Sequence, residues 1–203
     1  MLNISDVGLA VGASGTLNVV WATGGTSGGH AKIMDTPVTY GGAVGKSAAV
    51  ASGGYLFSDP DATVAGNRID AIWNGDQTST GPDGTFIASR VSNGGSWSAP
   101  SVTPPQGDAP DTSLSDSATT GSDGKPWVAW DGTDSMTVLH VGHPDQQATG
   151  SGCCAYYPGL AVDGKGNTLP LNARIASPPA GTAGAAFTLP TWPDIRSPCG
   201  LTC

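Results

Sequence analysis

The sequence predicts an all-β protein built from a repeated strand pattern, and three observations carry that prediction. The chain of 203 residues holds 31 Gly and 16 Pro, a composition that favours frequent turns over long helices. All 16 acidic residues are Asp, which favours turns, and Glu, which favours helices, is absent. The third observation is an apolar phrase that ends in tryptophan and recurs as "GTLNVVW", "NRIDAIW" and "GKPWVAW".

Alignment on this phrase extends into four repeats, near residues 4–56, 57–113, 114–155 and 156–203. Trp21, Trp73 and Trp130 are spaced 52 and 57 residues apart, and Asn172 takes the tryptophan's place 42 residues later. Self-similarity at this period is typical of propellers and other repeat arrays. We therefore expect a propeller-like array of about four blades in a single domain or fragment, which could also be part of a larger propeller.

Each copy has the pattern of a strand, a tight turn and a second strand. The turn carries Asp123–Gly124, Asp163–Gly164 or Gly66–Asn67, pairs that supply the positive φ of a hairpin. The second strand has apolar residues at both odd and even positions, which point to opposite faces. We therefore expect it to be covered on both faces, with its tryptophan in the core between blades. A β-sandwich of two sheets is the alternative architecture, because it also has short strands and regular turns.

One turn carries a motif of a known family. The stretch "VSNGGSWSAP" at 91–100 follows the third strand of the second copy and resembles the bacterial neuraminidase repeat, or Asp box, S-x-D-x-G-x-T-W. Ser96 and Gly94 match the Thr and Gly positions before Trp97, whereas Ser92 replaces the Asp and Arg90 the first Ser. The resemblance implies a sialidase-type propeller, with this turn between the third and fourth strands of a blade.

The catalytic set that the resemblance implies is incomplete. Sialidases use three arginines against the substrate carboxylate, an aspartate as acid/base, and a tyrosine nucleophile beside a glutamate, and this chain has no Glu. The repeat frame does not converge its four arginines, which are Arg68, Arg90, Arg174 and Arg196. We expect a non-catalytic binding module. The alternatives are a glycoside hydrolase or lyase using Asp residues, and a structural repeat segment of a longer secreted protein.

In a propeller, the loops between second and third strands and those between blades share one face. These loops carry aromatic rings, which suit sugar rings, and carboxylates, which accept hydrogen bonds from hydroxyl groups. The candidate ligand-binding residues are Tyr55, Tyr156, Tyr157, Asp76 and Asp134. They predict a carbohydrate or protein ligand, although Tyr156 and Tyr157 could instead brace the neighbouring cysteine loop.

The last quarter of the chain contains all of its cysteines, Cys153, Cys154, Cys199 and Cys203. An even number of cysteines in an acidic chain rich in Gly, Ser and Thr predicts disulfides and an extracellular or secreted protein. Three complete pairings are open, and we expect a bond from Cys153 or Cys154 to Cys199 or Cys203. Zinc ligation is the alternative, since "CGLTC" has a suitable spacing.

The sequence predicts no cofactor and no metal site, and a calcium site is the alternative. "DPDATV" and "DGKGN" resemble fragments of calcium loops without the full ligand order. His140 and His143, with Asp145 near them, are an odd number of residues apart, so on one strand they would point to opposite faces. Other aspartates, such as Asp61 and Asp123, stand in turn contexts, where the side chain bonds its own backbone.

Two classes of partner are disfavoured by charge and hydropathy. The net charge is −8 and the few Lys and Arg residues are scattered, which argues against nucleic acid. The chain has no run of eighteen apolar residues, so we expect no membrane insertion.

Overall fold

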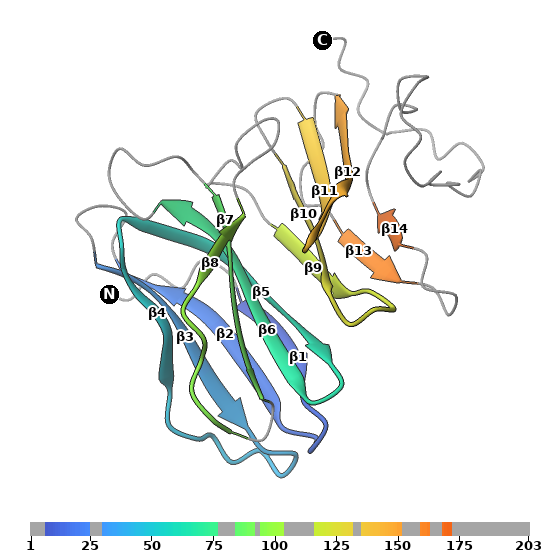
Figure 1. Cartoon of the computed structure of the whole chain (residues 1–203). Coiled ribbons are helices and arrows are strands. Elements are labelled where there is room, and N and C mark those ends of the chain that lie inside the picture. Colours follow the sequence, from blue (N-terminus) through green and yellow to red (C-terminus); the bar gives the residue numbers. More distant parts are fainter. Residues whose placement is uncertain are drawn as a thin grey trace, which may run out of the picture.

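The computed structural model describes residues 7–24, 30–76, 84–91, 94–103, 116–131, 135–151, 159–162 and 168–171. Every regular element in these ranges is a β-strand, and all strand pairs are antiparallel (Figure 1). The all-β class is therefore confirmed. The described strands form open sheets, and none of these sheets closes on itself.

The strands follow chain order within each sheet. Sheet one contains β1 (Val7–Val11), β2 (Leu17–Thr23), β3 (Ala31–Val38) and β4 (Ala48–Gly54). Sheet two contains β5 (Leu56–Ala65), β6 (Arg68–Asp76), β7 (Gly84–Val91) and β8 (Ser101–Thr103). Sheet three contains β9 (Asp116–Thr120), β10 (Pro126–Asp131), β11 (Ser135–His140) and β12 (His143–Ser151). A two-stranded sheet contains β13 (Gly159–Val162) and β14 (Thr168–Leu171).

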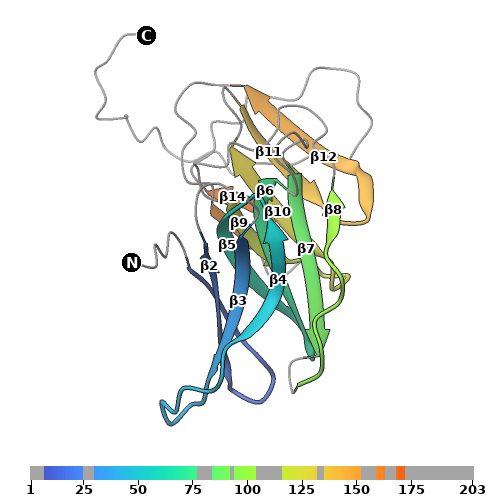
Figure 2. The same cartoon turned by 90° about the vertical axis from the view of Figure 1, so that its left-hand side faces the viewer.

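Glycines with positive φ make the tight turns of these meanders. Gly66, at φ +61°, stands in the β5–β6 hairpin, and Gly142, at φ +84°, stands in the β11–β12 hairpin. Residues with a Cβ rarely adopt a positive φ, so glycine is favoured at these points of the turns. Figure 2 shows the turns β1–β2 and β3–β4 together at the lower end of sheet one, as a meander requires.

Consecutive sheets contact one another through their first strands, β1 with β5, β5 with β9, and β9 with β13. Thr63 and Thr120 share a hydroxyl hydrogen bond of 2.6 Å between residues 57 apart in the chain. The backbone N–H of Ala118 donates to Asp61 Oδ2 at 2.7 Å, again 57 residues away. Because the separation is constant, β5 and β9 run in the same direction, and equivalent positions of neighbouring repeats lie side by side.

The first two sheets approach each other closely at Gly8 in β1. A Cβ placed on Gly8 would lie 2.5 Å from the backbone Cα and carbonyl carbon of Asp61 in β5. Real side chains do not tolerate such a distance, so the two backbones can meet here only because residue 8 is glycine.

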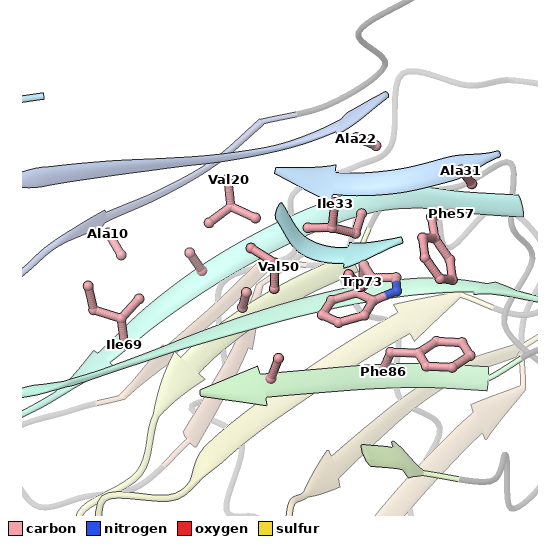
Figure 3. Close-up of a cluster of buried hydrophobic side chains, with 14 residues drawn as sticks. Ala10, Val20, Ala22, Ala31, Ile33, Val50, Phe57, Ile69, Trp73 and Phe86 are labelled. Carbon is pink, nitrogen blue, oxygen red and sulfur yellow. The ribbon is translucent and has the colours of Figure 1, made fainter. Parts of the chain in front are cut away.

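Sheet two is covered on both faces, as the sequence predicts for its apolar second strand. Ile69 and Trp73 of β6 pack in one cluster with Val20 and Ile33 of sheet one (Figure 3). Their neighbour Ile72 belongs to a second cluster, with residues of sheet three. Alternate residues of β6 therefore contribute to two cores, as the period of a strand dictates.

The tryptophans of sheets two and three are buried as expected. Trp73 is 0% exposed and stacks on Phe86 with ring centroids 5.7 Å apart and planes 8° apart. Trp130 is 1% exposed and packs with Ile72 and Ile87 of sheet two. Each of these tryptophans thus contacts the sheet that precedes its own.

Trp21 differs, and the expectation that it lies in the core is wrong for the described residues. It is only partly buried, and its indole N–H donates to Thr36 Oγ1 at 3.0 Å. Val7 and Leu9, which pair with Trp21 and Val19, are 47% and 57% exposed, and Val11 is 61% exposed. We call this side of sheet one the open face (Val7, Leu9, Val11, Val19 and Trp21). No described sheet precedes sheet one, so nothing described covers the open face.

Candidate functional site

Two of the candidate ligand-binding residues lie together. Tyr55 connects β4 to β5, and its backbone N–H donates to the carbonyl of Asp76, the last residue of β6, at 3.0 Å. Both residues are partly buried. The aromatic residue and the carboxylate therefore share one end of sheet two, the end at which β6 leaves the sheet.

The remaining candidates lie outside the described residues. These are Tyr156, Tyr157 and Asp134, together with Cys153, Cys154, Cys199 and Cys203. Their roles in ligand binding and in disulfide bonds stay predictions.

A second group of polar side chains converges at one end of sheet three. We call it the histidine–aspartate cluster, and it consists of Asp123, His140 and His143. Asp123 lies in the turn between β9 and β10, His140 ends β11 and His143 begins β12. In the meander, both turns lie at the same end of the sheet, so residues 17 and 20 apart in the chain meet.

The expectation that His140 and His143 point to opposite faces is wrong. They do not share one strand, because Val141 and Gly142 form a turn between them and the two histidines pair across the hairpin. Their imidazole rings stack with centroids 4.4 Å apart. A sequence signal was available, since two residues ending in Gly between two strand-like segments are typical of a hairpin loop.

Both imidazoles face the same carboxylate. Nε2 of His140 lies 3.1 Å from Asp123 Oδ1, and Nε2 of His143 lies 3.0 Å from Asp123 Oδ2. One nitrogen or oxygen atom from each of the three side chains falls within 4.8 Å of the other two. Among the described residues, this is the group whose side chains come close enough together to share one cation.

The surroundings of the cluster fix its members. The His140 ring stacks on Trp127 with centroids 4.3 Å apart and planes 6° apart. Asp123 Oδ1 also accepts a hydrogen bond of 2.9 Å from the backbone N–H of Lys125, so the expected turn role of Asp123 is confirmed. From sheet two, the Arg68 guanidinium donates to the carbonyl of Gly124, next to Asp123.

Exposure and charge differ across the cluster. The His140 side chain is 8% exposed, whereas those of His143 and Asp123 are 40% and 38% exposed. Burial raises the pKa of the Asp123 carboxyl, but hydrogen bonds from the Lys125 N–H, His143 and His140 outweigh it and lower that pKa to about 2. The carboxylate is therefore ionised at neutral pH, and solvent reaches it on the His143 side.

The two described arginines hold sheets together. Arg90 donates from Nη2 to Asn18 Oδ1 at 2.6 Å and to Asp35 Oδ2 at 2.7 Å, both in sheet one. Its guanidinium also lies 5.1 Å from the ring centroid of Trp97. Trp97 stands between β7 and β8, the third and fourth strands of sheet two. Arg174 and Arg196 lie outside the described residues.

No protein-family model matches the chain, and no match exists among curated proteins. The resemblance to sialidase-type propellers therefore rests on the residues quoted above. Within the described ranges, no helix is long and apolar enough to cross a membrane.

Proposed function

We propose that the chain is a non-catalytic extracellular binding module, built as a propeller-like array of about four blades, and that it binds a carbohydrate or protein ligand. The observation that carries the proposal is the set of hydrogen bonds between first strands, which join equivalent positions of neighbouring repeats. Thr63–Thr120 and Asp61–Ala118 are 57 residues apart, and Ser117–Leu160 are 43 apart. A propeller relates its blades in this way, with first strands side by side around an axis.

The open face supports the same architecture. In sheets two and three the repeat tryptophan contacts the preceding sheet. By analogy, a further blade packs against Trp21. Either the last repeat or a larger propeller supplies that blade. An apolar sheet face that carries Val7, Leu9 and Val11 is typical of a covered surface rather than of a solvated one.

The ligand-binding end follows from the strand order. In every meander, the loop between second and third strands and the connection to the next sheet emerge at the same end. Tyr55 and Asp76 belong to that end of sheet two. A tyrosine ring and a carboxylate at one end of a sheet suit a sugar, because the ring contacts its apolar face and the carboxylate accepts from its hydroxyl groups.

Hydrolysis by a pair of aspartates has less support. Asp35 pairs with Arg90, and Asp70 pairs with Arg68 at 2.8 Å. Asp61 accepts from the backbone N–H groups of Ala62 and Ala118, each at 2.7 Å. These carboxylates stabilise strands and the contacts between sheets. A glycosidase needs two carboxyl groups directed at a substrate.

A glycan array with the full chain tests the proposed ligand class. We expect binding that falls at least about tenfold, or about 1.4 kcal/mol, in Tyr55→Ala and Asp76→Asn. Tyr40→Ala is the matched control, because Tyr40 is 99% exposed between the third and fourth strands of sheet one, at the other end. A blank array removes the carbohydrate ligand. Release of reducing sugar from a bound glycan favours the hydrolase instead.

The extracellular location depends mainly on the cysteines. Peptide mapping without reductant should find at least one bond from Cys153 or Cys154 to Cys199 or Cys203. Such a bond closes a loop of about 45 residues and stabilises the chain by about 4 kcal/mol on the chain-entropy account. Four free thiols in protein purified without reductant would remove both the disulfides and the location inferred from them.

A further inference from the structure

We propose that the histidine–aspartate cluster binds one divalent transition metal ion, zinc foremost, through Nε2 of His140, Nε2 of His143 and one carboxylate oxygen of Asp123. The site is independent of the proposed ligand-binding end. It lies at the turns β9–β10 and β11–β12, which emerge at the opposite end of the sheet from the β10–β11 loop.

The spacing of the donor atoms fits a tetrahedral ion. Zinc bonds to nitrogen and oxygen of about 2.0–2.2 Å require neighbouring ligand atoms to be about 3.3–3.6 Å apart. Nε2 of His140 lies 3.1 Å from Asp123 Oδ1, and Nε2 of His143 lies 3.0 Å from Asp123 Oδ2, so the two imidazoles face different oxygens of one carboxylate. One ligand atom from each side chain lies within 4.8 Å of the other two, and a turn of the carboxylate and of the His143 ring brings the three atoms to the distances that the ion requires.

The donor types select the class of metal. Two imidazoles and one carboxylate suit zinc and its neighbours copper, nickel and iron. Calcium takes six to eight oxygen ligands, so this cluster does not suit it. Each imidazole gives its Nε2 lone pair to the ion and carries its proton on Nδ1.

The protein holds His140 and Asp123 in place before the ion arrives, whereas the partly exposed His143 ring turns out of its stack on His140 to bind. Trp127 covers one face of the His140 ring. The hydrogen bonds of Lys125 N–H to Asp123 and of Arg68 to the Gly124 carbonyl fix the turn from two sides. The exposed sides of Asp123 and His143 let the ion enter and let water complete its coordination.

The competing arrangement contains no metal. In it, both imidazoles carry a proton on Nε2 and donate it to Asp123. The two arrangements differ in which ring nitrogen is protonated and in whether zinc binds at all, so both can be measured.

Calorimetric titration of the full chain with zinc chloride tests the proposal. Native alkylation with iodoacetamide beforehand blocks any free thiols, so cysteine cannot account for the heat. We expect one zinc ion per chain, and an affinity that falls at least about tenfold in His143→Ala and in Asp123→Asn. His30→Ala is the matched control, since His30 is exposed and belongs to no part of the cluster, and its affinity should equal that of the wild type.

Two further measurements keep the test decisive if a variant folds poorly. Zinc should raise the melting temperature of the wild type and of His30→Ala but not that of His143→Ala. In the wild type, long-range nitrogen–proton spectra should move the His140 and His143 Nε2 resonances together as zinc is added. Unchanged affinity in His143→Ala and Asp123→Asn, or stationary imidazole resonances, would overturn the proposal.

Discussion

Trp73 and Trp21 occupy the same position in two copies of one repeat, but their surroundings differ. Trp73 is 0% exposed, between two aromatic rings and the residues of sheet one. Trp21 is partly buried, on a face that no described sheet covers. Both tryptophans follow a β-branched apolar residue at the same place in the repeat, and the sheets beside them differ. In this architecture, the burial of a repeat position is decided by the adjacent sheet rather than by its own strand.

The strands that carry these tryptophans show the same contrast. In β6, every residue from Ile69 to Gly75 is buried. In β2, the buried residues Asn18, Val20 and Ala22 alternate with partly buried ones. Strand β2 therefore has the burial pattern of a strand with one covered face, although its apolar residues are those expected for a strand covered on both faces.

The largest effect that we expect is that of Trp73→Ala. Removing this side chain leaves a cavity between sheets one and two, and it should lower the free energy of unfolding by about 3–5 kcal/mol. Urea unfolding measures the loss. Trp21→Ala should cost no more than about 1 kcal/mol if its ring is partly solvated, as in the described structure. Equal losses would show that the further blade proposed above covers the open face in solution, and a small loss would contradict that blade.

The second prediction concerns the ion pair that joins the two sheets. Asp35 and Arg90 have side chains 4% and 8% exposed, so Asp35→Ala leaves a buried guanidinium without its carboxylate. We expect a loss of about 3 kcal/mol in the same unfolding measurement. Asp70→Ala provides the comparison, because it leaves the Arg68 guanidinium, whose side chain is 34% exposed, so that water can replace much of the lost bond. A larger loss in Asp70→Ala would contradict this ranking of the two pairs.

The third prediction concerns the close approach at Gly8. Gly8→Ala forces a methyl group against the Asp61 backbone and should cost about 1–3 kcal/mol through displacement of β1 from β5. Gly41→Ala is the control, since the nearest atom to its added Cβ is the Thr39 hydroxyl at 4.0 Å. A neutral Gly8→Ala would mean that the first two sheets lie further apart than described.

The smallest effect concerns Asp61, at the contact between sheets two and three. Burial raises the pKa of this carboxyl, and the backbone hydrogen bonds from Ala118 and Ala62 only partly oppose it. Because the folded pKa is raised, folding favours the protonated form, and this contribution is lost as the pH rises through the folded pKa. The unfolding free energy of the wild type, relative to Asp61→Asn, should therefore fall as the pH rises above about 4, the ordinary pKa of an aspartate. A difference that rises with pH would reverse the assigned direction.

Local chemistry was enough to predict the β5–β6 and β9–β10 hairpins and the double coverage of β6. Glycine, Asn and Asp indicate turns, and apolar residues at both odd and even positions indicate a strand with two covered faces. The open face was beyond such reasoning, because Trp21 and Trp73 both end the apolar stretch of the repeat, and the sequence does not say which sheet lies beside each. The histidine–aspartate cluster was missed for a related reason. A strand and a two-residue turn are both consistent with "HVGH", and only the turn brings His140, His143 and Asp123 together.

Asp61 was predicted to bond its own backbone, and it does so at Ala62, but its second oxygen reaches Ala118 in another sheet.

The constant separation of partners across neighbouring sheets also bears on how the chain folds. Within a sheet, each strand pairs with the next strand along the chain, so hairpins can form by closing short loops, on the microsecond scale. Between sheets two and three, the hydrogen bonds join residues 56 or 57 positions apart. Closing a loop of that length carries an entropic penalty that grows only with the logarithm of its length. Meanders that form first and dock afterwards, in chain order, are the folding sequence that this geometry favours, and a nascent chain could complete one sheet before the next is synthesised.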